Sequence, residues 1–195
     1  MNKYKKSLLP FEKSENDDYK FSGWLARYGN KDRDGDIIEK GAFKDAIANK
    51  DTYKLHYNHK RTNGDWVNDG NLKEELDMVI GTFKAVDKEE GVWIDAELFK
   101  DEENAQKVYK LLKSGAISEM SIGFGVMDQE DYVYDKEIGG YRFMKAIITE
   151  GSVVDVPANP LATIEQVKSI DKKFDKERRV LELREEIKAL LKKIK

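Results

Sequence analysis

Three residues of this chain, a serine, a histidine and a glutamate, have the types and sequence settings of a hydrolytic site. Ser121 lies in the segment Ser118–Val126, whose period of two predicts a strand. One face of this strand would carry Met120, Ile122, Phe124 and Val126, and the other Ser121, Gly123 and Gly125. The nearly bare second face leaves room for another chain to approach, because glycine has no side chain. A serine hydroxyl in such a place could act as a nucleophile.

The chain has two histidines, and both lie in the segment Tyr53–His59, whose alternation also predicts a strand. Residues three apart on a strand point to opposite faces. His59 shares its face with Tyr53, Leu55 and Tyr57, whereas His56 shares its face with Lys54 and Asn58. The alternation therefore predicts a half-buried His59 that could serve as a base, and a solvent-exposed His56.

Glu150 stands within the apolar run Ala146–Val154. A carboxylate in such a run is costly unless a cation or a hydrogen-bond donor pairs with it. Ser121, His59 and Glu150 could thus supply a nucleophile, its base and the acceptor that orients the base. They also fit a structural interpretation: a core serine, a hydrogen-bonded histidine and a glutamate paired with Arg142 or Lys145. The pattern alone leaves both interpretations open.

The elements that must position these residues are a series of strands with a few helices. The strands are expected at Phe21–Tyr28, Tyr53–His59, Met78–Val86, Gly91–Phe99, Ser118–Val126 and Tyr141–Val156. Helices are expected at Gly41–Ala48, Asp101–Ser114 and Ala162–Ile170, and an amphipathic helix from Phe174 onward. Asp101 is the expected N-cap of its helix and Gly115 its end. Residues 61–75 read as a polar loop and 128–140 as a polar insertion or hairpin.

The segment Asn30–Gly41 looks like a calcium-binding loop, because oxygen-bearing side chains alternate along it around Gly35. Its last position, which should be a bidentate glutamate, is Gly41. No clear amphipathic helices flank it. An Asp/Gly turn is therefore the favoured interpretation, with a calcium-binding module as an alternative.

Length and composition indicate one domain with two tails. The 195 residues divide into a flexible N-terminal segment 1–20, a domain 21–170 and a basic amphipathic C-terminal helix 171–195. The absence of cysteine excludes disulfides, thiolate zinc sites and a cysteine nucleophile. The chain shows neither a signal-peptide apolar region nor an apolar run of about 18 residues, so we expect a soluble, unsecreted protein without a membrane partner.

Charge is distributed unevenly along the chain. Residues 171–195 carry a net charge of +4 and residues 1–20 a net charge of +1, so the total of −3 leaves −8 on residues 21–170. An acidic body argues against nucleic acid as the main ligand. The basic tail could dock on an acidic protein or on the body itself, or form only a solvated helix face.

Several short pieces follow one another in a distinctive order. They are Asp34-Gly35-Asp36-Ile37-Ile38, Gly41-Ala42-Phe43, Asn58-His59, Ile80-Gly81, Gly91-Val92-Trp93-Ile94, Ser121-Ile122-Gly123-Phe124 and Glu150-Gly151-Ser152-Val153-Val154-Asp155-Val156-Pro157-Ala158-Asn159-Pro160. In order and spacing they resemble the tailed-phage (caudoviral) prohead maturation serine protease family over residues 21–170. Two features depart from the family pattern: Lys60 follows His59 where aspartate is common, and the loop before Ile80 looks longer.

The resemblance implies an α+β fold similar to herpesvirus assemblin, a small, mostly antiparallel β-barrel wrapped by helices. It implies a serine endopeptidase with Ser121 as nucleophile, His59 as base and Glu150 as third member, and no cofactor or metal. Backbone N–H groups near the serine strand, with Arg142 as a further candidate, would stabilise the oxyanion. The expected partners are the major capsid protein and scaffold as substrates, cut inside the assembling prohead in the cytoplasm of the infected bacterium, together with self-cleavage. A homo-oligomer stays open, and the rival interpretation is a non-catalytic capsid or scaffold-assembly protein on the same fold.

Overall fold

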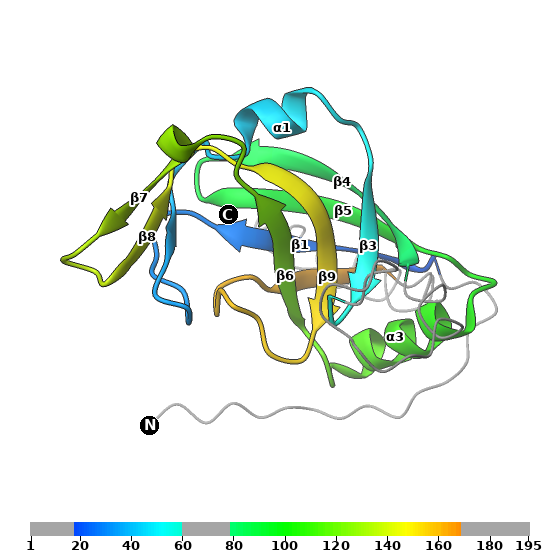
Figure 1. The fold of residues 1–195 in the computed structure, drawn as a ribbon. Helices are drawn as coiled ribbons and strands as arrows, with labels where there is room; N and C mark the ends of the chain where they lie inside the picture. Colours follow the sequence, from blue (N-terminus) through cyan, green and yellow to red (C-terminus); the bar gives the residue numbers. More distant parts are fainter. Residues whose placement is uncertain (1–17, 60–78, 169–195) are drawn as a thin grey trace, which may run out of the picture. The chain divides into compact units, whose positions relative to one another are not determined.

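The computed structural model describes residues 18–59 and 79–168 (Figure 1). The predicted polar loop 61–75 and the predicted C-terminal helix 171–195 lie outside the described residues. Contacts divide the chain into two compact units, and residues 19–167 belong to the first of them.

The described residues form many strands and few helices. Their order is β1 (Lys20–Arg27), β2 (Ile37–Ile38), α1 (Lys44–Ala48), β3 (Tyr53–Tyr57), β4 (Val79–Lys88), β5 (Gly91–Leu98), α3 (Glu103–Ser114), β6 (Glu119–Gly125), a 3-10 turn (Gln129–Asp131), β7 (Tyr132–Asp135), β8 (Gly140–Phe143), β9 (Ile147–Val154) and β10 (Ile164–Lys168). The prediction of an α+β protein made mostly of strands is confirmed.

Seven strands form one curled sheet in the order β10-β1-β5-β4-β3-β9-β6 (Figure 1). The pairs β1–β5, β4–β5, β3–β4 and β6–β9 are antiparallel, whereas β3 and β9 run parallel. Large apolar side chains from these strands make the core, and each is at most 2 % exposed: Phe21, Leu25, Leu55, Ile80, Phe83, Ile94 and Met120. The curled sheet thus forms a half-barrel, and the core fills its concave side.

The segment from Ala162 to Ile164 joins the two outer ends of this sheet. The Met120 N–H donates to the Ala162 carbonyl at 2.9 Å, and the Ile164 N–H donates to the Ser118 carbonyl at 2.8 Å. On the other side, the Trp24 N–H donates to the Thr163 carbonyl at 2.8 Å. Strands β1 and β6 are therefore both hydrogen-bonded to one segment.

The prediction of a helix at Ala162–Ile170 is wrong, because this stretch contains strand β10. Its β-branched residues Thr163, Ile164 and Val167 suit a strand. The hydrogen bonds to its neighbours supply the tertiary contacts that override a helical pattern. Close approach also needs Gly23, where a Cβ atom would lie 2.3 Å from the Thr163 carbonyl oxygen.

Helix α3 delivers the chain into β6. It begins one residue after Glu102, whose side chain accepts a hydrogen bond from the Asn104 N–H at 3.0 Å, so the predicted N-cap Asp101 is wrong by one residue. It ends as predicted at Gly115, which has a left-handed φ of 68°. Its apolar stripe is buried as predicted: Ala105, Val108, Tyr109 and Leu112.

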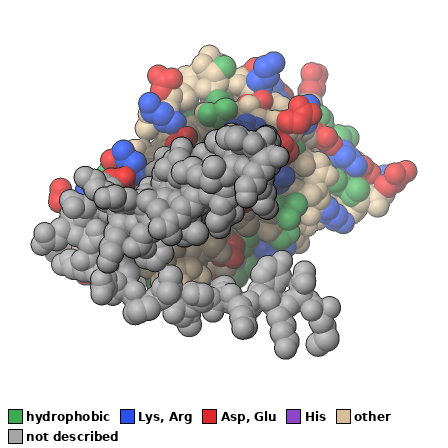
Figure 2. All heavy atoms as spheres, turned by 180° about the vertical axis from the view of Figure 1, so that it is seen from behind, with side chains coloured by type: hydrophobic (Ala, Val, Ile, Leu, Met, Phe, Trp, Pro, Cys, Tyr) green, Lys and Arg blue, Asp and Glu red, His purple; other side chains and the backbone are tan. Residues whose placement is uncertain are grey.

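The smaller sheet has the order β2-β8-β7 and projects from one end of the large sheet (Figure 1). The predicted insertion 128–140 is therefore part of a hairpin, in which Tyr134 pairs with Tyr141. The predicted strand Tyr141–Val156 is two strands, β8 and β9, in different sheets. On the face seen in Figure 2, positive and negative side chains of the described residues are interspersed.

The loop that resembles a calcium site is closed by its own aspartates. Asp32 Oδ1 accepts hydrogen bonds from the N–H groups of Asp34 at 3.0 Å and Asp36 at 2.8 Å, and Asp36 Oδ1 accepts from the Tyr141 N–H at 2.8 Å. These hydrogen bonds support the interpretation of the segment as an Asp/Gly turn. In residues 18–59 and 79–168, no group of three or more His, Cys, Asp or Glu is placed to hold a metal ion. Across the same residues, no helix is both long and apolar enough to cross a membrane.

Candidate active site

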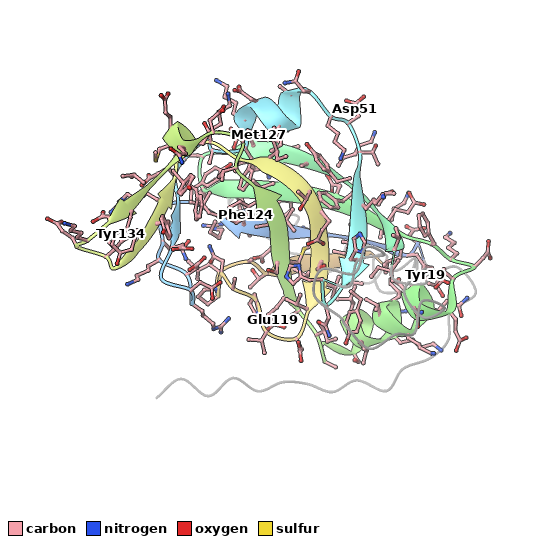
Figure 3. The ribbon with its side chains drawn as sticks, viewed as in Figure 1. Tyr19, Asp51, Glu119, Phe124, Met127 and Tyr134 are labelled. Carbon is pink, nitrogen blue, oxygen red and sulfur yellow. The ribbon has the colours of Figure 1, made fainter. Side chains whose placement is uncertain are left out.

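Ser121 lies on β6, the strand paired with β9, and is 5 % exposed. Figure 3 shows β6 running from Glu119 to Phe124 beside β9. In the register of the two strands Ser121 stands opposite Ser152. The predicted alternation holds only in part: of the expected apolar face Met120 is buried, but Ile122 and Phe124 are half-buried and line the same cavity as Ser121. The register with β9 also shifts between Gly123 and Phe124.

His59 lies just beyond β3, which ends at Tyr57, so the strand predicted to reach His59 is two residues too long. Asn58 and His59 both have left-handed backbone angles, with φ of 51° and 56°. Their N–H groups are nevertheless held by β9: Asn58 donates to the Val153 carbonyl at 3.0 Å and His59 donates to Ser152 Oγ at 3.1 Å. A turn fixed to β9, not strand alternation, therefore orients the His59 side chain. The prediction of a half-buried His59 is wrong, because this side chain is 41 % exposed.

Glu150 is 2 % exposed, and both of its carboxylate oxygens have partners. Oε1 lies 2.8 Å from His59 Nδ1, and Oε2 accepts a hydrogen bond from the Ser152 hydroxyl at 2.8 Å. Burial is the largest single influence on the Glu150 pKa and acts to raise it. The hydrogen bond and charge of His59, the hydrogen bond of Ser152 and the charge of His56 together bring the pKa below its ordinary value. Glu150 is therefore a buried carboxylate in its charged form near neutral pH.

The alternative pairing of Glu150 with Arg142 or Lys145 is wrong. Arg142 binds Glu39 at 2.7 Å and Asp135 at 2.6 Å, and Lys145 lies 3.2 Å from Asp45. Two carboxylates thus occupy the Arg142 guanidinium, which makes it a poor candidate for an oxyanion donor.

Ser121 and His59 line the same cavity, which has a volume of about 250 Å³. Its other lining residues are Leu25, Asp32, Asp34, Asp36, Ile38, Ile122, Phe124, Ala158 and Asn159. Among the described residues no hydrogen bond joins Ser121 to His59. Contacts of this kind are often long without substrate and tighten when it binds. Since His59 Nδ1 faces Glu150, its Nε2 is the nitrogen that can take a proton from a hydroxyl in the cavity.

The far wall of the cavity is built around Asn159. Its side-chain amide donates to the Arg27 carbonyl at 3.2 Å and to Asn30 Oδ1 at 3.1 Å, while its Oδ1 accepts from the Leu161 N–H at 3.0 Å. The adjacent Ala158 carbonyl accepts from the Arg33 N–H at 2.9 Å. Burial raises the pKa of Asp32 on this wall.

The prediction that His56 faces solvent is wrong, because His56 is 5 % exposed. The register between β3 and β4 shifts between Leu55 and His56, so both residues are buried and strand alternation fails there. On its other side β3 pairs with β9, where His56 stands opposite Ser152. Both histidines therefore lie close to the Glu150 carboxylate.

Sequence reasoning missed Ser152 as a residue of the site. Ser152 is 0 % exposed and contacts both Glu150 and the backbone of His59. The available signal was its spacing, since a residue two positions from Glu150 on a strand shares its face.

The cavity is thus lined by a serine and by a histidine that is hydrogen-bonded to a buried carboxylate, which are the residue types that a serine hydrolase uses. The family model described as caudovirus prohead serine protease matches residues 7–177, and the chain belongs to that family. The chain is also similar to the "Prohead protease" of Enterobacteria phage HK97, with 32 % identity over an alignment of 156 residues that covers 77 % of this chain. It spans 61 % of the length of that relative. No solved structure matches the chain.

Proposed function

We propose that this chain is a serine endopeptidase that cleaves capsid and scaffold proteins, and itself, during phage prohead maturation. Ser121 is the nucleophile, His59 the general base and Glu150 the carboxylate that orients and stabilises His59. The observation that carries the proposal is the 2.8 Å contact of His59 Nδ1 with Glu150 Oε1, beside a cavity that Ser121 and His59 both line. Family membership and the name of the HK97 relative support prohead proteins as the substrate class and the assembling prohead as the place of action. The similarity of the fold to assemblin stays a prediction.

The reaction follows from these positions. Ser121 Oγ attacks the carbonyl carbon of the scissile peptide bond while His59 Nε2 takes the hydroxyl proton. The peptide C–N bond then breaks, and the leaving amine takes that proton from His59. Water repeats the sequence with His59 as base, releases the acid product and restores the Ser121 hydroxyl.

Glu150 contributes through its charge and its burial. A carboxylate that stays ionised near neutral pH stabilises the imidazolium formed at His59 in both steps. Because Glu150 is almost fully buried, little water weakens this interaction. A buried charge would be costly in a purely structural role without such a partner.

Labelling of the purified chain with a fluorophosphonate probe tests the proposal. We expect covalent labelling at Ser121 and cleavage of prohead proteins, detected by mass spectrometry after incubation with the capsid protein of the same phage. Ser121→Ala should remove both without loss of thermal stability, because no other group replaces the acyl acceptor.

Ser118→Ala is the matched control, since Ser118 lies three residues earlier and, within the described part of the chain, its hydroxyl donates to the neighbouring Glu119 at 3.0 Å and does not line the cavity. This variant should label and cleave as the unaltered chain does. Cleavage that persists in Ser121→Ala would overturn the assignment of the nucleophile. Failure of the unaltered chain to label would favour the non-catalytic capsid or scaffold-assembly protein.

A further inference from the structure

The Ser152 hydroxyl lies between two members of the proposed catalytic group and contacts both. It donates to Glu150 Oε2 at 2.8 Å and accepts from the His59 N–H at 3.1 Å. A hydroxyl can do both at once, because it has one donor hydrogen and two acceptor lone pairs. Ser152 is 0 % exposed, so within the fold these contacts do not compete with bulk water.

The contact with Glu150 determines which carboxylate oxygen faces His59. Each buried carboxylate oxygen needs a hydrogen-bond donor. Ser152 supplies one to Oε2, so Oε1 is directed at His59 Nδ1. Without this hydroxyl, the buried carboxylate would lose one of its hydrogen-bond donors, and rotation of the carboxylate would compete with the contact to His59.

The contact with His59 acts on the backbone. His59 and Asn58 have left-handed φ values, which are uncommon for residues other than glycine. A strained turn persists only where its surroundings hold it. The hydrogen bond from the His59 N–H to Ser152 Oγ ties this turn to β9, the strand that also carries Glu150.

The strand register also places Ser152 next to Ser121, the proposed nucleophile. Ser152 stands opposite Ser121 across the β6–β9 pair and opposite His56 across the parallel β3–β9 pair. Directly opposed residues project from the same face of a sheet. Ser152 is thus the residue of β9 that stands opposite Ser121 and hydrogen-bonds to both His59 and Glu150.

We propose that Ser152 is a positioning residue of this site, whose hydroxyl fixes the Glu150 carboxylate and the His59 turn in the geometry that catalysis needs. The inference rests on the proposed function, because it assigns Ser152 a role toward His59 and Glu150. Ser152 acts through these two residues and does not touch substrate.

Removal of the hydroxyl tests this role. Ser152→Ala should lower kcat/KM about 10- to 100-fold, the effect of losing one hydrogen bond to a charged group. The loss should fall on kcat, with KM within about twofold of the unaltered value, because the misplaced groups act in the chemical step. Ser152→Thr keeps the hydroxyl and should recover most of the rate.

Ser22→Ala is the matched control. Ser22 is also a buried strand serine, 2 % exposed on β1, and it does not line the cavity. Its variant should keep the unaltered kcat/KM. An equal loss of rate in the two variants would mean that any buried hydroxyl matters through stability, and would overturn the proposal.

A double-mutant cycle with Glu150→Gln decides between positioning and general destabilisation. If Ser152 acts through Glu150, Ser152→Ala should cost less than about threefold once Glu150→Gln is already present. Additive losses would overturn the inference even if Ser152→Thr fails to fold. Where hydrolysis is too slow to measure, the rate of fluorophosphonate labelling at Ser121 replaces kcat/KM.

The cycle also separates this inference from the proposed function. Cleavage by Ser121→Ala, or an unchanged rate in Glu150→Gln, would refute the proposed group and the inference with it. An inactive Ser121→Ala together with additive Ser152 and Glu150 losses would refute the role of Ser152 alone.

Discussion

His59 Nδ1 and Glu150 Oε1 are 2.8 Å apart although 91 residues separate them in the chain. The parallel pairing of β3 with β9 brings them together, because it places Leu55–Tyr57 beside Gly151–Val153, and the left-handed turn at Asn58 and His59 follows directly. One partner is 2 % exposed and the other 41 % exposed at the side chain. The pair thus joins a buried charge to a ring that reaches the cavity.

The two histidines should respond differently to substitution. His59→Ala should lower kcat/KM by several orders of magnitude, because it removes the proposed base. His56→Ala should lower kcat/KM by less than about tenfold but reduce the free energy of unfolding by about 1–3 kcal/mol, since His56 is buried. Peptide kinetics and urea unfolding of both variants measure the two effects. A stable but inactive His56→Ala, beside an active His59→Ala, would mean that the base is His56.

The free energy of unfolding should depend on pH at acidic pH because of Glu150. Its pKa in the folded protein is below the ordinary value of 4.5, so its ionisation stabilises the fold fully above that pH. The contribution is lost as the pH falls below 4.5 through the folded pKa. His59, Ser152 and His56 are the groups that face the carboxylate and hold this pKa down.

Urea unfolding of the unaltered chain and of Glu150→Gln at several pH values checks the direction of this pH dependence. The difference in the free energy of unfolding that favours the unaltered chain should shrink between about pH 5 and about pH 3. Asp95→Asn, on β5 and exposed, is a control that should leave the pH dependence as it is. A growing advantage toward low pH would show that Glu150 has a raised pKa.

The sequence was sufficient for features that depend on local pattern. Helix α3 has a clear apolar stripe and a terminal Gly115, and the β4–β5 pair has alternating residues around a tight turn. Ser121, His59 and Glu150 stood out because each departs from its surroundings. Their contact could not be read from the pattern, because the β3–β9 pairing is parallel and spans a long stretch of chain.

The errors share a physical cause, which is that tertiary pairing altered local periodicity. A register shift buried His56 with Leu55, and a left-handed turn after Tyr57 took over the orientation of His59. Strand β10 formed where a helix was expected because the segment Ala162–Ile164, which leads into it, is hydrogen-bonded both to Trp24 of β1 and to Met120 of β6. Ser152 was missed because its one sequence signal, a spacing of two residues from Glu150, has no chemical meaning until Glu150 is known to contact His59.

The junction that curls the large sheet back on itself should be sensitive to a single methyl group. In Gly23→Ala the new Cβ would lie 2.3 Å from the Thr163 carbonyl oxygen and 2.7 Å from Ile164 Cα, both backbone atoms that cannot rotate away. β10 must therefore move off β1, and we expect a loss of about 1–3 kcal/mol in the free energy of unfolding. Gly125→Ala is the matched control on β6, where the new Cβ would meet only Ile147 Cγ1 at 3.8 Å. It should change stability by less than about 0.5 kcal/mol. Urea unfolding of the two variants measures the difference, and equal stabilities would show that the contact of Thr163 with β1 contributes nothing to holding the curled sheet.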